Sequence, residues 1–225
     1  MRGVVYSCGP CPYLPDREFH AFHPKPNPPS EIPYRVLMDH RFRRSGDQLY
    51  MPMCPGCQAC KPIRIDIERF KARDDQRRCL KRNSDLTVTW HPRGRDAERD
   101  QLFCRYQMTI HGKPPDDEGL NFLLEDGGIA GGELHARDSD GQLIAVSVVD
   151  VFADALSSVY CYYDPSQSRR SLGTFMILSE IAHCQAQTYR WLYLGFLVHG
   201  CRKMVYKARF LPHEVLDDGQ WQRSE

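Results

Sequence analysis

Three cysteines follow one another with two residues between each pair, at Cys54, Cys57 and Cys60, in a stretch rich in turn-forming residues. Cys8 and Cys11 repeat this spacing upstream. The spacing lets neighbouring thiolates converge on a tetrahedral zinc ion or a cubane iron–sulfur cluster. The sequence therefore predicts a zinc or iron–sulfur site, with reduced thiols packed in a small subdomain as the alternative.

Arginines crowd the stretch that follows these cysteines, and Arg77, Arg78 and Arg82 lie within a few positions of one another. A guanidinium offers planar, paired donors that suit a phosphate or a carboxylate. An RNA backbone or an acidic peptide end would fit such a surface. An ordinary solvent-exposed helix is an equally good interpretation of the pattern.

A third candidate site lies in the second half of the chain, where an apolar stretch at 158–163 ends at Asp164 and Pro165. Arg170 and Gly173 follow, at the start of a segment with helical spacing. A basic, glycine-containing turn that leads from a strand into a helix can bind an anion through main-chain N–H groups and the helix dipole. Such turns are common, so this indication is weak by itself.

The elements that must position these residues alternate between strand and helix patterns. We expect strands at 62–67, 86–90, 143–149, 157–163 and 191–195, and a hairpin over 42–50 that turns at 46–47. Helices are expected at 96–111, with Asp96 as the N-cap and Gly112 after the end, and at 170–187. The proline-rich stretch 8–33 should be irregular extended backbone, and 127–132 a flexible loop.

Composition places the chain among ordinary globular proteins, because 41% of its residues are hydrophobic and its formal net charge is +1. Neither a signal peptide nor an apolar run of about 20 residues, the length that spans a bilayer, is visible. We therefore expect a cytoplasmic location, where thiols stay reduced and do not form a disulfide framework.

Several motifs, in the same order, resemble the arginyl-tRNA–protein transferase family along nearly the whole chain. In the first half these are CPYLP at 11–15, FRRSG at 42–46, CKPIR at 60–64 and the arginine-rich stretch 76–86. In the second half they are YDP at 163–165, RSLG at 170–173, YLGF at 193–196, CRKM at 201–204 and YKARF at 206–210.

The short length and the cysteine cluster resemble the bacterial aspartate/glutamate leucyltransferase branch. That resemblance implies transfer of leucine from leucyl-tRNA to proteins with an N-terminal Asp or Glu, which marks them for degradation. It implies an α/β fold, with a small Cys-rich N-terminal domain at 1–92 and a C-terminal N-acetyltransferase-like (GNAT) mixed-sheet domain at 93–225. No cofactor is needed for the chemistry, aminoacyl-tRNA is the co-substrate, and the enzyme should be a monomer.

The resemblance also suggests roles for individual residues. Catalytic roles fall on Tyr160, Asp164, Tyr206 and Lys207. Binding of the acidic N-terminus or of the tRNA falls on Arg43, Arg44, Arg77, Arg78, Arg82, Arg170 and Lys203. The metal ligands would be Cys11, Cys54, Cys57 and Cys60, with Cys8 as a possible substitute.

Three other functions compete with leucine transfer. An arginyl-tRNA donor with the same acceptors is the nearest. A coenzyme A-dependent N-acetyltransferase is more distant, because Phe175 stands where that fold usually has a second small residue after the helix-opening glycine. A zinc-ribbon RNA-binding module without catalytic activity is equally distant, since it would not explain the whole series of motifs.

Overall fold

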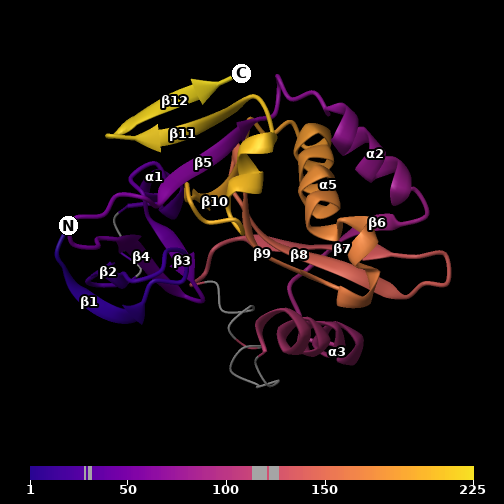
Figure 1. Cartoon of the computed structure of the whole chain (residues 1–225), viewed down its shortest axis with the longest axis horizontal. Coiled ribbons are helices and arrows are strands. Elements are labelled where there is room, and N and C mark those ends of the chain that lie inside the picture. The colour runs from indigo at the N-terminus through magenta and orange to yellow at the C-terminus, as the bar shows by residue number, and fades with distance from the viewer. Residues whose placement is uncertain (28, 30–31, 113–120, 122–126) are drawn as a thin grey trace. The chain divides into compact units, whose positions relative to one another are not determined.

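The computed structural model describes residues 1–27, 29, 32–112, 121 and 127–225 (Figure 1). The chain forms two compact units. Unit 1 contains Met1–Phe70 and Tyr193–Glu225, and unit 2 contains Lys71–Leu192. These units do not follow the expected division between residues 92 and 93, because the chain returns to unit 1 after Leu192.

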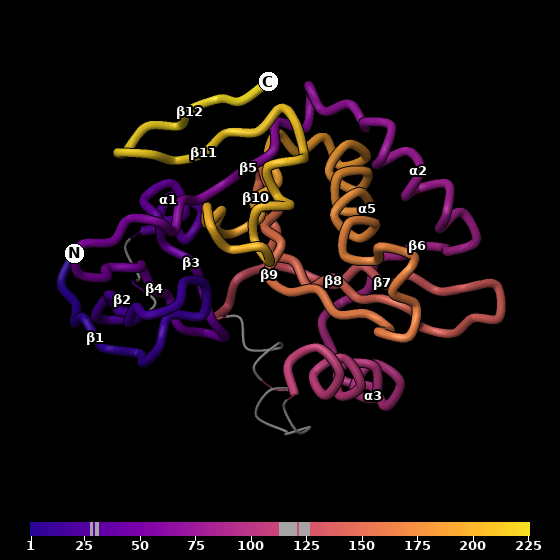
Figure 2. Tube along the Cα trace, viewed as in Figure 1, coloured from indigo at the N-terminus to yellow at the C-terminus, as the bar shows by residue number. Residues whose placement is uncertain are grey.

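Unit 1 contains a small sheet with the strand order β1-β2-β4-β3, and the strands β12-β11-β5-β10 in that order. The elements of the first part of the chain are β1 (Gly3–Pro10), β2 (Glu18–Pro24), α1 (Tyr34–Met38), β3 (Arg43–Ser45), β4 (Gln48–Pro52) and β5 (Lys61–Asp66). Those of the last part are β10 (Trp191–Leu197), whose first two residues belong to unit 2, η3 (Val205–Arg209), β11 (His213–Asp217) and β12 (Gln220–Ser224). Figure 2 shows β11 returning along β5, with which it pairs antiparallel.

The proline-rich N-terminal stretch is more regular than expected, because β1 and β2 form an antiparallel pair. Pro10 and Pro24 stand at the ends of the two strands, and the register shifts between Ser7 and Pro10. A proline at a strand end or a bulge removes no interior ladder hydrogen bond, so the sheet tolerates it. The expectation of irregular backbone is therefore wrong for residues 8–10 and 18–24.

The hairpin expected at 42–50 is confirmed as β3 and β4, in which Ser45 pairs with Gln48 across the turn. Gly46 has a φ of 62°, the left-handed conformation that such two-residue turns require. The strand expected at 62–67 is confirmed as β5. It is buried on both faces and not on one, because Arg64 and Asp66 are also buried and are paired with Glu214 and Arg223.

Unit 2 is built on the strands β9-β8-β7-β6, and the β6–β7, β7–β8 and β8–β9 pairings are antiparallel. Its elements are α2 (Asp74–Arg82), β6 (Thr87–His91), α3 (Ala97–Tyr106), η1 (Gln107–His111), β7 (Gly131–Arg137), β8 (Leu143–Val151), β9 (Ala155–Tyr163), η2 (Pro165–Arg170) and α5 (Leu172–Ala186). The strands expected at 86–90, 143–149 and 157–163 are confirmed as β6, β8 and β9.

The loop expected at 127–132 is wrong for its last two residues, because β7 begins at Gly131. A Cβ on Gly132 would collide with the Trp90 ring and lie 2.7 Å from the His91 carbonyl oxygen. A Cβ on Gly131 would collide with the Arg93 guanidinium. These two glycines therefore permit close packing in the sheet, and they are not hinges of a flexible loop.

The helix expected at 96–111 is confirmed as α3, with a last stretch, η1, that is π-helical. The Asp96 side chain accepts a hydrogen bond from the Arg99 main-chain N–H at 2.8 Å, and Gly112 has a φ of 63°. This is an N-cap followed by a left-handed C-terminal residue. The second expected helix, α5, begins at Leu172 and not at residue 170, because η2 precedes it and Ser171 has a φ of 57°.

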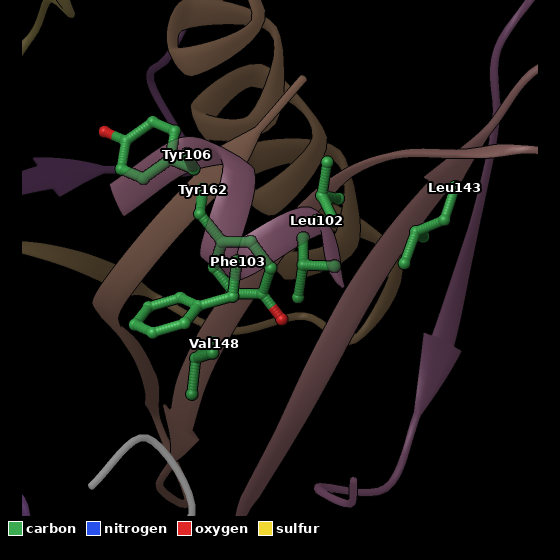
Figure 3. Close-up of a cluster of buried hydrophobic side chains, with 7 residues drawn as sticks. Leu102, Phe103, Tyr106, Leu143, Val148 and Tyr162 are labelled. Atoms are coloured by element: carbon green, nitrogen blue, oxygen red, sulfur yellow. The ribbon is translucent and has the colours of Figure 1, made fainter. Parts of the chain in front are cut away.

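Helices α3 and α5 cover opposite faces of the unit 2 sheet (Figure 1). Val146 and Val148 of β8 pack with Phe103 of α3, whereas Ser147 donates a hydrogen bond to Glu180 of α5. Alternate side chains of a strand face opposite ways, so one strand serves both layers. Figure 3 shows Leu102, Phe103, Leu143, Val148 and Tyr162 meeting in the α3-side core.

The expected α/β fold class is confirmed by these two units. Elements that the sequence patterns did not predict are β1, β2, α1, β7, η2, η3, β11 and β12. Within the part of the chain that the structure describes, no helix is long and apolar enough to cross a membrane.

Candidate active site

The residues selected from the sequence are divided between the two units. Unit 1 holds Cys8, Cys11, Arg43, Arg44, Cys54, Cys57, Cys60, Lys203, Tyr206 and Lys207. Unit 2 holds Arg77, Arg78, Arg82, Tyr160, Asp164 and Arg170.

Unit 1 has a pocket of about 240 Å³ whose walls are mainly aromatic. It is lined by Cys8, Pro12, Tyr13, Phe19, Ala21, His23, Ser45, Tyr50, Pro52 and Phe196. The Tyr50 ring stands edge-on to the Phe19 and Phe196 rings, with centroids 6.1 and 6.5 Å apart. Strands β2 and β4 and the loop after β1 thus meet residue 196 of β10 around one concave site. The sequence patterns did not indicate this pocket, although Tyr13 and Phe196 lie in the motifs.

Arg43 is buried next to this pocket, with only 5% of its surface exposed. Its guanidinium donates hydrogen bonds to the main-chain oxygens of Met38, Phe42 and Gly195, at 3.1, 2.6 and 3.2 Å. Its central carbon lies 5.2 Å from the centroid of the Phe196 ring. Burial lowers the pKa of Arg43, against the opposing influence of Tyr34 and Tyr50. Arg43 is therefore a buried cation behind the pocket wall and not an exposed ligand for tRNA.

Arg44 is also buried and holds the hairpin turn that follows it. Its guanidinium donates to the Gly46 oxygen at 2.8 Å, and its main-chain N–H donates to the Tyr34 hydroxyl at 3.0 Å. The contacts of Arg44 thus shape the strand that carries Ser45 to the pocket rim.

Lys207 lies against the same stretch of β10 as Arg43. Its ammonium donates to the Phe196 main-chain oxygen at 3.0 Å. Gly195 has a φ of 73°, and a Cβ there would be 3.8 Å from the Lys207 nitrogen. Two cations, Arg43 and Lys207, therefore bind successive carbonyls of β10 beside the pocket, while Tyr206 and Lys203 are exposed.

The cysteines expected to bind a metal lie in one region of unit 1. Burial, and next the nearby Cys11, Cys54 and Cys57 thiols, raise the pKa of Cys60 to about 12. Cys54 sulfur accepts a hydrogen bond from the His20 N–H at 3.3 Å. Within residues 1–27, 29, 32–112, 121 and 127–225, no three His, Cys, Asp or Glu side chains are grouped to hold a metal ion. The thiols expected to bind a metal thus lie in one part of unit 1, and the metal site itself stays a prediction.

Tyr160 of unit 2 is half-buried among aromatic rings, including Phe103 and Tyr106 at centroid distances of 6.2 and 6.4 Å. Its hydroxyl accepts a hydrogen bond from the Gln107 amide at 3.0 Å. Burial raises the pKa of Tyr160 to about 12. Its phenol is therefore neutral near pH 7 and can donate a hydrogen bond, but it cannot act as a general base there.

Asp164 caps η2, which leads into α5. Its carboxylate accepts hydrogen bonds from the Ser166 N–H at 3.0 Å, the Ser166 hydroxyl at 2.7 Å and the Gln167 amide at 3.1 Å. Burial alone would raise the pKa of Asp164, but these hydrogen bonds outweigh it and lower the pKa. Asp164 also lines an open cavity of about 570 Å³ with Arg105 and Met108 of α3 and η1.

The arginines of unit 2 fall into an engaged pair and an exposed pair. Arg170 binds both carboxylate oxygens of Asp85, at 2.9 and 2.8 Å, and Arg82 donates to the Arg169 oxygen at 2.7 Å. These contacts tie the end of α2 and the residues that follow it to the end of η2. Arg77 and Arg78 lie on the exposed face of α2, where Arg77 pairs with Asp74. The exposed-helix interpretation of this stretch therefore describes its structure.

A buried charged cluster in unit 2 was missed from the sequence. Arg99 and Glu133 are fully buried and joined by paired hydrogen bonds, and His135 binds the same carboxylate at 2.8 Å. The His135 ring stacks on His91, with centroids 4.2 Å apart. No spacing marks these residues, because β7 was not predicted and the alternation of Leu134 and Ala136 with Glu133 and His135 would place the two polar residues on a solvent-facing side.

Comparison with known proteins relates both halves of the chain to one family. The family model described as the N terminus of arginine-tRNA-protein transferase matches residues 9–78, and that of its C terminus matches residues 98–217. The aspartate/glutamate leucyltransferase of Saccharophagus degradans is 37% identical over 218 residues, covering 94% of this chain and 92% of the relative. That of Pseudomonas putida strain GB-1 is 39% identical, with the same coverage.

Among solved structures, the chain is similar to a C-terminal DUF2156 domain assigned to a lysylphosphatidylglycerol synthetase of Agrobacterium fabrum. The TM-score is 0.55 at 16% identity, and the match covers 74% of this chain and 59% of the other. This likeness concerns the fold alone.

Proposed function

This chain belongs to the arginine-tRNA-protein transferase family, and from that premise we propose that it transfers leucine from leucyl-tRNA to the N-terminal α-amine of proteins that begin with Asp or Glu. Its protein substrates would thereby be tagged for degradation. The enzyme would act as a monomer in the cytoplasm, with aminoacyl-tRNA as co-substrate.

One observation carries this proposal. Relatives named aspartate/glutamate leucyltransferase align with 94% of the chain at 37–39% identity. The alignment therefore includes both compact units, the aromatic pocket and the basic face of α2. A protein that shared only the acyltransferase-like fold, or only the cysteine-rich segment, would not be expected to match over this length.

The chemistry asks little of the protein. The aminoacyl ester is already activated, and an α-amine has a pKa of about 7.7–8.0, so a useful fraction is deprotonated near pH 7 without a strong base. Positioning of the amine and the ester can contribute about 7–11 kcal/mol at best. A neutral Tyr160 hydroxyl is suited to hydrogen-bond developing charge on the ester oxygen, whereas the Asp164 carboxylate is occupied at its cap.

We expect no covalent leucyl-enzyme intermediate, because positioning and electrostatics are sufficient for attack by the free amine. Rapid mixing of enzyme with labelled leucyl-tRNA, followed by an acid quench, should leave no label on the enzyme. A burst of labelled protein, stoichiometric with enzyme and formed without acceptor, would contradict this mechanism.

The exposed face of α2 is suited to the phosphate backbone of the donor. Arg78→Ala should weaken leucyl-tRNA binding and reduce the slope of log K against log salt by about 0.7–0.9, the value for one phosphate contact. Arg78→Lys should keep the slope, since it keeps the charge. Binding titrations at several salt concentrations measure both, and an unchanged slope in Arg78→Ala would exclude this contact.

The direct test of the function is mass spectrometry of a peptide with N-terminal Asp, incubated with the protein and either leucyl-tRNA or arginyl-tRNA. A leucine adduct is expected, and peptides with N-terminal Ala or an acetylated Asp should stay unmodified. If well-folded protein adds neither amino acid, the transferase proposal fails.

An arginyl donor is the second candidate, because the family to which the chain belongs is the arginine-tRNA-protein transferase family. The same experiment separates the two, because an arginine adduct in place of leucine would keep the reaction class and reverse the donor. The acceptor peptide is common to both arms, so a difference between them reports on the donor alone.

The zinc or iron–sulfur site stays a prediction. Elemental analysis of protein purified without oxygen should find about one zinc ion or one cluster per chain, held by Cys11, Cys54, Cys57 and Cys60. Cys57→Ser should lose that metal. If active wild-type protein contains only background amounts of zinc and iron, the prediction is wrong, and the thiols are reduced side chains that pack in the subdomain.

A further inference from the structure

The aromatic pocket of unit 1 is suited to an apolar guest. Tyr13, Phe19, Tyr50 and Phe196 present ring surfaces to a volume of about 240 Å³. A dry cavity of about 150 Å³ in a protein core can already hold benzene. The four carbons of an isobutyl group would therefore fit here, and burying them would be favourable.

The charge around the pocket opposes a basic guest. Among the described residues that line it, none is Asp or Glu. Arg43 is a buried charge behind the wall, and its guanidinium carbon lies 5.2 Å from the Phe196 ring centroid. The hydrogen bonds of Arg43 go to main-chain oxygens of Met38, Phe42 and Gly195. A second guanidinium in the pocket would lose its hydration beside a like charge, with no carboxylate on the walls to compensate.

We propose that this pocket receives the uncharged side chain of the aminoacyl donor, and that Arg43 behind Phe196 disfavours a basic side chain there. The inference rests on the proposed function, since it needs an aminoacyl donor. It deepens that function by locating the choice of leucine over arginine in unit 1.

Ser45 offers a way to fill the pocket from its rim. Ser45 is exposed, lines the pocket, and pairs across the hairpin with Gln48, which is exposed and does not line it. Ser45→Phe should lower kcat/KM for leucyl-tRNA by about 100-fold, the loss expected when four buried carbons no longer find their site. Gln48→Phe, the matched control on the partner strand, should stay within about twofold.

His23 offers a test that does not depend on blocking the pocket. His23 lines it and is half-buried, and its ring lies 6.4 Å from that of Tyr50. His23→Glu would place a carboxylate on the wall, and His23→Gln would place a side chain of the same shape without charge. The ratio of arginine to leucine transfer should be at least about tenfold higher in His23→Glu than in His23→Gln.

The outcomes separate this inference from the function it rests on. If wild-type protein transfers neither amino acid, the proposed function fails. If wild type transfers leucine, all four variants unfold at the wild-type temperature, and Ser45→Phe and His23→Glu change neither kcat/KM nor the donor ratio, the pocket is not the donor site. If a variant of one pair unfolds at a lower temperature than wild type, the other pair tests the inference. The pairs are Ser45→Phe with Gln48→Phe, and His23→Glu with His23→Gln.

Discussion

Glu133→Gln should lower the free energy of unfolding by about 3–5 kcal/mol, the usual cost of breaking a buried ion pair by removing one partner. Glu133 and Arg99 are both fully buried in unit 2. Arg99 donates from Nε to the two carboxylate oxygens at 3.0 and 2.9 Å, with a further short hydrogen bond from Nη2. Glutamine keeps the shape and loses the charge, so it leaves the buried guanidinium to the more distant carboxylate of Asp100, at 3.8 Å.

The control is the double replacement Arg99→Met with Glu133→Leu. It removes both charges, so it should be far less destabilising than Glu133→Gln, because no charge is left unpaired. Urea unfolding followed by circular dichroism measures both variants. If Glu133→Gln costs less than about 1 kcal/mol, the pair contributes no more than a surface salt bridge does, and the buried cluster does not hold α3 on the sheet.

The same cluster predicts how stability depends on pH. Burial alone would raise the pKa of Glu133, but hydrogen bonds from His135 and Arg99 and their charges prevail and lower it below its ordinary 4.5. A carboxylate with a lowered folded-state pKa contributes fully above its unfolded pKa, and the contribution is lost as pH falls through the folded pKa. Wild type should therefore lose stability below about pH 4.5 more steeply than Glu133→Gln does.

Local patterns in the sequence were sufficient for the elements whose structure is decided locally. The Asp96 cap, the turn at Gly46 and the alternation at Ile63 and Ile65 each depend on neighbouring residues and a fixed period. Strand β7 was missed because its two leading glycines match a loop by composition. Only their neighbours in space, such as the Trp90 ring, show why glycine is needed there.

The site was harder to predict than the fold, because its residues come from separate parts of the chain. The pocket is lined by the segment around Tyr13, by β2 and β4, and by Phe196. No spacing in the sequence indicates that these segments lie together. Motif resemblance found Arg43 and Lys207 but suggested contact with substrate. In the structure, both side chains instead donate hydrogen bonds to main-chain oxygens of β10. Burial and hydrogen bonds show this role, which cannot be inferred from the residue type.

Arg43→Met should destabilise unit 1 by about 3 kcal/mol or more. It leaves the buried oxygens of Met38, Phe42 and Gly195 without the donor they now share, and each unsatisfied acceptor costs about 1–3 kcal/mol. Removal of a buried cation offsets part of this loss. Arg17→Met, at an exposed position of the same unit, should change stability by less than about 0.5 kcal/mol.

Arg43→Lys separates the charge of Arg43 from its hydrogen bonds. A lysine keeps a positive charge but offers a single ammonium, which cannot match a planar guanidinium bound to three carbonyls. It should therefore lose stability nearly as Arg43→Met does, while it still disfavours arginyl-tRNA. Donor ratios measured well below the unfolding temperature should then rise in Arg43→Met and stay low in Arg43→Lys. Equal ratios in the two variants would mean that the charge behind Phe196 does not select the donor, and that Arg43 acts only by holding the backbone of the pocket.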